Sequence, residues 1–317
     1  MAGRADKRRV NASGLPPSRT LVVHSADGTR LHTEVFGPKT GYPIVLAHGI
    51  TCSLRVWREQ ILDLSRDHRV IAYDHRGHGR SGVPGPSSYS LDHLAADLDA
   101  VLAAALRPGE RAVVAGHSMG GIAISAWSDR FRHRVDERVD AVALINTTTG
   151  DLLDKIQLLR MPGVLRAARV SAARTMIRSL GGAPLVRGTQ PGSLRFLQMM
   201  AVGAHADPAI SDFLHELFAA TPPAGRGAWA RVLVDEMGHR AHIDLSGLTV
   251  PTLVIGSTED RLLPMSQARK IAEAAPHLVD LVELPGGHCA ILEHAADVNA
   301  HLRDLVGVTA AAQRISS

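Results

Sequence analysis

Short runs of mostly apolar residues recur along the chain, and each of them leads into a loop that is rich in glycine or polar residues. The runs lie at 44–47, 70–73, 112–114, 141–145, 251–255 and 281–284. Such runs are typical of strands that are buried on both faces of a parallel sheet, with helices between the strands. The pattern therefore predicts an α/β fold with a mostly parallel, doubly wound sheet.

The middle of the chain lacks this strand pattern and has helical periodicity instead. Asp207 and Pro208 suit the N-cap and the first position of a helix. The apolar residues that follow have the spacing i, i+3, i+4, i+7 and i+8 of one helix face: Ile210, Phe213, Leu214, Leu217 and Phe218. This helix should end before Pro222, and another is predicted within 152–159. We therefore expect a helical insertion at residues 151–240.

The apolar run at 112–114 leads into a G-x-S-x-G motif formed by Gly116, Ser118 and Gly120, and a helical stretch follows at 122–127. A strand that turns sharply into a helix strains the residue at the bend, and flanking glycines remove the Cβ clashes. The Ser118 hydroxyl would then stand clear of the sheet edge, next to helix N–H groups that can stabilise an oxyanion. This context makes Ser118 the candidate nucleophile.

A nucleophilic serine needs a base and a carboxylate that orients the base. His288 lies on a Gly-rich loop after the last apolar run, and Asp260 follows the run before it. Open α/β sheets place their reactive groups at these carboxyl ends of strands. The chain order Ser118, Asp260, His288 is that of the α/β-hydrolase triad. Glu259 is an alternative acid, but neighbours at a strand end point in opposite directions, so only one of the two can face the histidine.

Together these motifs resemble those of the α/β-hydrolase-fold serine hydrolases, over about residues 21–305. The likeness also includes a strand and His-Gly loop at 44–50, a D-x-R-G-x-G-x-S turn within 70–81, Pro264 after Asp260, and Glu293 after His288.

The resemblance implies a site and a division of the chain. The backbone N–H groups of Ile50 and Met119 would form the oxyanion hole. Residues 21–150 and 241–317 would form the α/β-hydrolase core, and the helical insertion at 151–240 would be a cap that roofs the active site.

Two related enzyme classes do not fit. Epoxide hydrolases and haloalkane dehalogenases resemble this architecture but use an aspartate where this chain has Ser118. Epoxide hydrolases also need tyrosines in the cap, whereas Tyr42, Tyr73 and Tyr89 all lie outside the predicted insertion. The resemblance therefore implies a serine hydrolase that cleaves carboxylic esters through an acyl-enzyme and needs no cofactor.

The methionines of the insertion bear on the substrate. At least two of them are expected to serve plain packing, but together they could form a pliable apolar wall that fits acyl chains. The predicted partner is thus a small-molecule ester with an apolar acyl group. A cofactor-free haloperoxidase or perhydrolase, a C–C bond hydrolase and a thioesterase are alternatives on the same triad, and a non-catalytic small-molecule receptor is another. The methionines are Met161, Met176, Met199 and Met200.

Charge and composition limit the other partners. The 317-residue chain has a formal net charge of +4. Its N-terminal tail, residues 1–20, is basic and lacks hydrophobic periodicity, so we expect it to be disordered. The remaining basic residues are scattered, which argues against nucleic-acid binding. No apolar run approaches the roughly 18 residues of a membrane span, and the N-terminus lacks the pattern of a secretory signal.

The cysteines and histidines complete the expectations. With 2 cysteines the chain cannot build a disulfide framework, which favours a reducing compartment such as the cytoplasm. Cys52 and Cys289 are expected either to be small buried hydrophobes or to lie near the pocket, where alkylation would block substrate. No spaced metal-ligand set is present, so we predict no metal. Four further histidines are expected to pack or hydrogen-bond around turns: His48, His75, His78 and His117.

Overall fold

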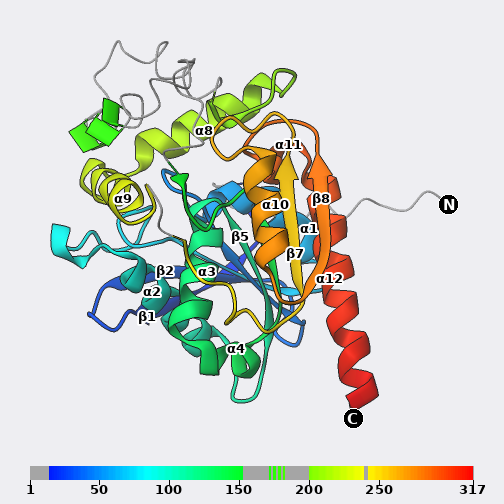
Figure 1. Cartoon of the computed structure of the whole chain (residues 1–317). Coiled ribbons are helices and arrows are strands. Elements are labelled where there is room, and N and C mark those ends of the chain that lie inside the picture. The colour runs from blue at the N-terminus through cyan, green and yellow to red at the C-terminus, as the bar shows by residue number, and fades with distance from the viewer. Residues whose placement is uncertain are drawn as a thin grey trace.

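A computed structural model describes residues 14–152, 171–172, 174–175, 178–179, 181–182, 200–238 and 242–316, and the side chains as far as residue 309. An eight-stranded sheet runs through this part of the chain in the order β1-β2-β4-β3-β5-β6-β7-β8 (Figure 1). β2 pairs antiparallel with β1 and β4, and all the other neighbours are parallel. The predicted mostly parallel α/β sheet is confirmed. The strands are β1 (Ser18–His24), β2 (Arg30–Phe36), β3 (Pro43–Ala47), β4 (Arg69–Tyr73), β5 (Ala112–His117), β6 (Val139–Ile145), β7 (Thr252–Ser257) and β8 (Leu278–Leu284).

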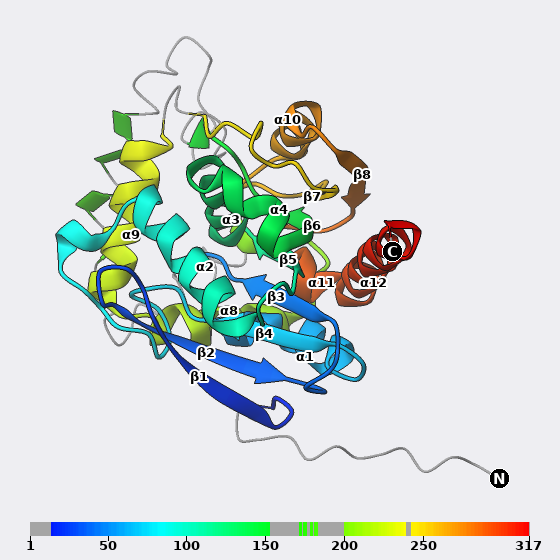
Figure 2. The same ribbon diagram turned by 90° about the horizontal axis from the view of Figure 1, so that it is seen from below.

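Helices cover both faces of the sheet, as Figure 2 shows from below. They include α1 (Arg58–Leu64), α2 (Leu91–Ala105), α3 (Met119–Arg130), α4 (Arg132–Arg138), α8 (Pro208–Ala220), α9 (Pro223–Glu236), α10 (Met265–Ala274), α11 (Ala290–Glu293) and α12 (Ala295–Ser316). Short 3-10 helices lie at η1 (Leu54–Trp57) and η2 (Pro86–Ser88). None of the described helices is both long enough and apolar enough to span a bilayer.

The core has two layers because successive side chains of a strand point to opposite faces. On β3, Ile44 and Leu46 pack in the cluster that includes residues of α1 and α12. Val45 and Ala47 pack in a second cluster on the opposite face, with residues of α2, α3 and α10. All five residues of β3 are buried, which explains why the sequence of a central parallel strand is an unbroken apolar run.

The described part of the predicted insertion contains α8 and α9. Helix α8 begins as predicted, because Asp207 caps it and its Oδ1 accepts a hydrogen bond from Ala209 N at 2.9 Å. It ends at Ala220, before the proline pair at 222–223. Figure 1 shows α8 beyond the arrowhead of β7, at the carboxyl end of the strands. The helix predicted within 152–159 lies outside the described residues from 153 onwards, as do Met161, Met176 and Met199, whereas Met200 is buried.

The N-terminal boundary differs from the expected one. Residues 1–13 lie outside the described part of the chain. Strand β1 begins at Ser18, and Leu15 is already buried in the core with 2% of its surface exposed. The folded chain thus begins before residue 20, the predicted end of the tail. The prediction placed this boundary too late because a polar edge strand, unlike the buried strands, leaves little hydrophobic signal in the sequence.

Candidate functional site

Ser118 stands at the turn between β5 and α3, in a backbone conformation that side chains rarely adopt. Its φ is 53° and its ψ is −118°, a strained combination that costs about 1–3 kcal/mol. The surrounding structure holds it there: Ser118 N donates to Ile145 O at 3.0 Å, and Thr147 Oγ1 donates to Ser118 O at 2.7 Å. The strand–turn–helix geometry predicted for this motif is present.

The two glycines of the motif are required by close approach of the backbone. A Cβ on Gly116 would lie 2.4 Å from the carbonyl oxygen of Gly120, and a Cβ on Gly120 would lie 2.0 Å from that of Ala47. Real Cβ atoms essentially never come so close to backbone oxygens, so any larger residue would push α3 away from β3 and β5. The glycines thus let the turn close with Ser118 at its tip.

Asp260 and His288 meet at the carboxyl ends of β7 and β8. His288 Nδ1 donates to Asp260 Oδ2 at 2.8 Å, and the Asp260 side chain is fully buried. The second carboxylate oxygen, Oδ1, accepts hydrogen bonds from the backbone N–H groups of Leu262 at 2.9 Å and Leu263 at 2.8 Å. The carboxylate is therefore fixed in direction and the imidazole carries its proton on Nδ1, which leaves Nε2 as an acceptor.

Asn146 is a contact of this acid that sequence reasoning missed. It follows β6 with a positive φ of 43°, and its Nδ2 donates to Asp260 Oδ2 and to Ser257 Oγ, both at 3.0 Å. The residue is buried, so the two hydrogen bonds are shielded from water. An asparagine directly after an apolar run is the one signal the sequence offers, since Asn tolerates the left-handed conformation better than most residues.

The neighbouring acid, Glu259, faces another way. It is exposed, and its Oε2 accepts a hydrogen bond from Ala204 N at 2.9 Å. Adjacent residues at the end of β7 thus point in opposite directions, and it is Asp260 that contacts His288.

The segment that leads into α8, residues 200–204, packs against the histidine loop. Cys289 N donates to Ala201 O at 3.1 Å, and Gly203 N donates to Glu293 Oε2 at 2.8 Å. Glu293 also accepts from Gly287 N at 3.1 Å, so one carboxylate joins the two segments. A Cβ on Gly287 would lie 2.3 Å from the backbone of Val202. This segment of the insertion is therefore tied directly to the loop that carries His288.

His117 connects the nucleophile turn to the histidine loop. It immediately precedes Ser118, and its Nε2 lies 2.8 Å from the carbonyl oxygen of His288. Burial lowers the pKa of His117 to about 3, so the ring is neutral at physiological pH and donates through Nε2. This contact brings the loop of His288 beside Ser118.

The His-Gly loop passes over the same turn. A Cβ on Gly49 would lie 3.1 Å from the Cβ of Ser118, so the backbone of this loop contacts the nucleophile directly. Ile50 follows Gly49, and Met119 is the first residue of α3. Among the described residues, neither the Ile50 nor the Met119 amide has a backbone acceptor. The two predicted oxyanion donors therefore lie on segments that meet at Ser118.

Comparison with known proteins identifies the family. A family model described as the alpha/beta hydrolase fold matches residues 42–295. The chain belongs to the α/β hydrolase fold family. The matched range contains the Ser118 turn, both loops of the Asp260–His288 pair and the described helices α8 and α9.

Individual relatives cover nearly the whole chain at modest identity. The chain is 29% identical over 285 residues to a protein named "Putative carbamate hydrolase RutD" from Variovorax paradoxus, covering 87% of this chain and 96% of that protein. It is 28% identical over 295 residues to a non-heme haloperoxidase from Rhodococcus erythropolis, covering 90% and 98%. The crystal structure of the enol-lactonase from Burkholderia xenovorans LB400 aligns with a TM-score of 0.69 at 25% identity, covering 92% and 100%. These findings support an α/β-hydrolase-fold enzyme.

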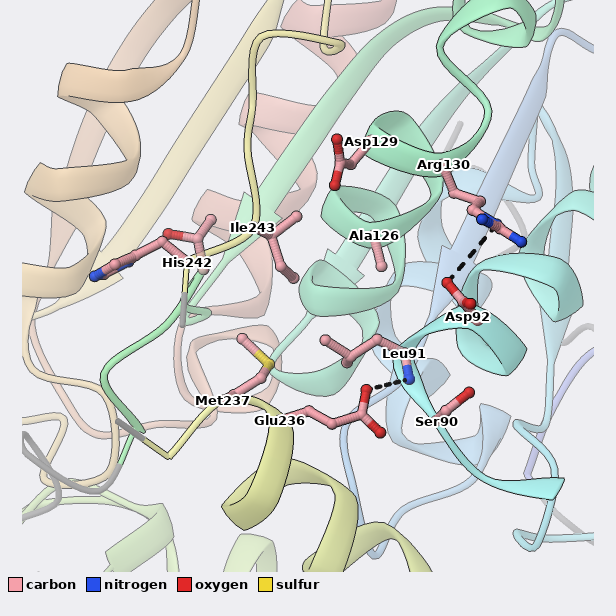
Figure 3. A pocket seen from close by; sticks show the side chains of 11 residues that line it. Ser90, Leu91, Asp92, Ala126, Asp129, Arg130, Glu236, Met237, His242 and Ile243 are labelled. Carbon is pink, nitrogen blue, oxygen red and sulfur yellow. Dashed lines mark hydrogen bonds and ion pairs between the residues drawn. The ribbon is translucent and has the colours of Figure 1, made fainter. Parts of the chain in front are cut away.

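A pocket of about 550 Å³ lies on another side of this α/β hydrolase, where the end of α9 meets α2 and α3 (Figure 3). Leu91, Met237 and Ile243 contribute apolar side chains, and Asp92 and Arg130 form an ion pair at its rim with a separation of 3.7 Å. At 1.5 Å per residue, the part of α3 that lines the pocket begins about 12 Å along the helix from the nucleophile turn. The pocket is therefore separate from the candidate triad.

Both cysteines are buried in the same core cluster, which favours the packing role over the pocket role. Burial raises the pKa of Cys52 to about 12 and holds that of Cys289 well above its ordinary value. At pH 8 a pKa of about 12 leaves about one thiol in 10⁴ as the reactive thiolate.

We therefore expect a bulky thiol reagent to modify the native enzyme far more slowly than the urea-unfolded chain, with enzyme activity retained meanwhile. Time courses of thiol modification and of enzyme activity, followed on one sample, measure the two effects. Rapid modification of the native protein together with loss of activity would contradict the burial of the two thiols, and the site of modification would then identify the exposed one.

Acid should destabilise the fold through its buried histidines. Burial lowers the pKa of His75 to about 3 and that of His78 to about 4, and holds that of His48 well below its ordinary value. Unfolding returns each ring to a pKa of about 6.5, so between about pH 6.5 and 4 the unfolded chain binds more protons. The free energy of unfolding should consequently fall as the pH falls through this window.

Replacing His78 with glutamine isolates one of these rings. Its Nε2 accepts a hydrogen bond from Thr51 N at 3.1 Å, which a glutamine oxygen can also accept without titrating. Urea unfolding at several pH values should show that the free energy of unfolding depends less on pH in His78→Gln than in the wild type. The slope should be smaller by up to about 1.4 kcal/mol per pH unit. The same change at the exposed His133 is the control. Equal pH dependence of the wild type and His78→Gln would contradict the neutral, buried ring.

The metal prediction is not tested by the structure. Within the described ranges, no group of three or more His, Cys, Asp and Glu residues is arranged to hold a metal ion. The clustered histidines instead hydrogen-bond to the backbone of the turns around the site, the role that the sequence suggested for them.

Proposed function

We propose that this α/β hydrolase is a serine hydrolase that cleaves carboxylic esters of apolar acyl groups through an acyl-enzyme. The observation that carries the proposal is the 2.8 Å hydrogen bond between Asp260 and His288, on loops that pack beside the strained turn of Ser118. A nucleophile, a base and a residue that orients the base are the parts that this chemistry needs.

Acylation uses the three residues in turn. His288 Nε2 takes the proton from Ser118 Oγ while the oxygen attacks the ester carbonyl. Asp260 keeps the ring proton on Nδ1 and stabilises the imidazolium. The N–H groups of Met119 and Ile50 stabilise the oxyanion, at about 3 kcal/mol per donor where such groups have been removed.

Deacylation repeats the sequence with water. His288 protonates the leaving alcohol, which departs, and then removes a proton from the water that attacks the acyl-enzyme. Collapse of the second tetrahedral intermediate releases the acid and returns the proton to Ser118. These steps balance without a cofactor. We place the activity in a reducing compartment such as the cytoplasm, in keeping with two cysteines that are both free thiols.

An apolar cluster beside the two amides supports the apolar acyl group. The side chains of Met119 and Ile50 pack with Ile122 and with Trp229 of α9. Trp229 Nε1 donates to Arg76 O at 2.9 Å, which fixes α9 on the core. The side chains packed around the candidate oxyanion donors are therefore apolar, which supports a preference for alkyl over charged acyl groups.

A series of p-nitrophenyl esters of increasing acyl length tests this proposal. Each methylene that becomes buried should raise kcat/KM by about fourfold, the equivalent of about 0.8 kcal/mol, until the pocket is filled. The hemisuccinate ester, whose acyl group is charged, is the matched comparison for the butyrate ester. Equal kcat/KM for these two would contradict an apolar acyl site, and binding of the esters without turnover would indicate a receptor.

A second activity is favoured by the haloperoxidase from Rhodococcus erythropolis, to which the chain is 28% identical over most of its length. In a cofactor-free perhydrolase, hydrogen peroxide instead of water attacks the acyl-enzyme and releases a peracid. Peroxide-dependent bromination of a dye in acetate buffer would reveal it. Acyl-CoA and carbamate substrates on the same preparation test a thioesterase and the activity named for the RutD relative.

A further inference from the structure

The Gly49–Ile50 peptide is held by the side chain of the preceding residue. His48 Nδ1 lies 2.7 Å from the carbonyl oxygen of Gly49. The peptide is trans, so its C=O and its N–H point in opposite directions. Whatever fixes the Gly49 carbonyl therefore also fixes the direction of the Ile50 N–H, which is one of the two candidate oxyanion donors.

The hydrogen-bond network determines which nitrogen of His48 carries the proton. His75 N lies 3.0 Å from His48 Nε2, and a backbone amide can only donate, so Nε2 is the unprotonated nitrogen. The ring is fully buried against the rings of His75 and His78, and both burial and these neighbours hold its pKa well below the ordinary value. A neutral ring with a free Nε2 carries its proton on Nδ1 and donates to Gly49 O.

The rest of the loop is held on both sides of this peptide. His75 Nε2 donates to His48 O at 3.0 Å, and His78 Nε2 accepts from Thr51 N at 3.1 Å. Thr51 has a positive φ of 61°, so the chain leaves the loop in a constrained conformation. The Gly49 carbonyl is thus directed toward the His48 imidazole, and the Ile50 N–H points away from that ring.

We propose that His48 is a positioning residue of the oxyanion hole, which holds the Gly49–Ile50 peptide with the Ile50 N–H directed at the oxyanion formed on attack by Ser118. This inference rests on the proposed function. Without the Nδ1–H donor the peptide can rotate and point its carbonyl oxygen toward the oxyanion, where it would repel the developing charge. The loss would appear in the transition state and leave ground-state binding of the ester largely unchanged.

Two substitutions separate the donor from the acceptor of the ring. In His48→Asn the amide nitrogen lies near the position of Nδ1 and can still donate to Gly49 O. In His48→Gln the amide lies near the position of Nε2, so the donor is lost. We expect His48→Gln to lower kcat about 10- to 100-fold with KM little changed, below the 10²–10³ measured for outright removal of an oxyanion donor. His48→Asn should retain most of the turnover, and His133→Gln controls for the substitution itself.

Inhibition by an alkyl boronic acid, which forms a tetrahedral adduct on a nucleophilic serine, gives a second readout. The affinity for the boronic acid should fall in His48→Gln in parallel with kcat. A merely structural defect would instead lower the midpoint of thermal unfolding, and the losses of kcat and of boronate affinity would not be proportional. Equal kcat in the wild type and His48→Gln would overturn the proposal, and so would equal losses in His48→Asn and His48→Gln.

Nitrogen NMR of the wild-type imidazoles tests the proposal without any variant. It should show His48 protonated on Nδ1 and unprotonated on Nε2, and the reverse tautomer would overturn the inference. Failure here is distinguishable from failure of the proposed function: labelling of Ser118 by a fluorophosphonate depends on the nucleophile, and its absence in the wild type would count against the serine hydrolase itself.

Discussion

Replacing Ser118 with alanine is expected to lower ester turnover by several orders of magnitude, because no other group can form the acyl-enzyme. His288→Ala should lose a comparable amount, since the hydroxyl is a weak nucleophile without its base. The residues act as a unit, so the double variant should be little worse than either single one. Steady-state turnover of a p-nitrophenyl ester measures all three effects.

The matched control is Ser128→Ala on the same helix, whose hydroxyl donates to Ser125 O at 2.9 Å within α3. It should keep its activity. The Ser118→Ala protein should also unfold near the wild-type temperature, because alanine keeps the Cβ and the backbone hydrogen bonds of Ser118 to Ile145 and Thr147. Wild-type turnover in Ser118→Ala would show that the nucleophile lies elsewhere.

The second large effect separates the two adjacent acids. Asp260→Asn should lower turnover by about 10⁴, because the asparagine can present an N–H to His288 Nδ1 and select the wrong tautomer. Glu259→Gln should lower it little, since Glu259 is exposed and contacts Ala204 N instead of the histidine. Parallel kcat measurements on the two variants make the comparison.

Asp260→Asn also disturbs the hydrogen bonds from Leu262 and Leu263, so its free energy of unfolding must be measured beside its kinetics. A folded Asp260→Asn with little activity fits the assigned role. The reverse ranking, a larger loss in Glu259→Gln than in Asp260→Asn, would overturn the assignment of the acid.

The sequence predicted those parts of the site that depend on local backbone geometry. The turn at Ser118 requires glycines at both flanks because of backbone contacts of 2.4 and 2.0 Å, and this requirement appears in the sequence as a motif. The apolar runs of β3, β4, β5, β6 and β7 reflect burial on both faces of the sheet, so these strands and the loops after them could be placed as well. The run at 281–284 also marked a strand, but β8 is an edge strand that is largely exposed, so the burial expected there was wrong. Asp260 and His288 followed from their positions after two such runs.

Contacts between distant segments could not be predicted in this way. Asn146 reaches Asp260 across 114 residues, and Gly203 reaches Glu293 across 90. Neither pair has a fixed spacing that would make a motif. The role of His48 depends on a donor from His75, on another loop, so its tautomer becomes visible only in the folded structure. The insertion also provides only helical periodicity, which determines one apolar face and leaves the shape of the pocket open.

Mass spectrometry of the enzyme after reaction with a fluorophosphonate tests the central claim most directly. The account predicts a single adduct per chain, on the peptide that contains Ser118, with loss of ester turnover in proportion to labelling. Prior addition of an ester-like competitive inhibitor should slow both. An adduct on another residue that accompanies the loss of turnover, or full labelling of Ser118 with turnover intact, would contradict the serine hydrolase mechanism.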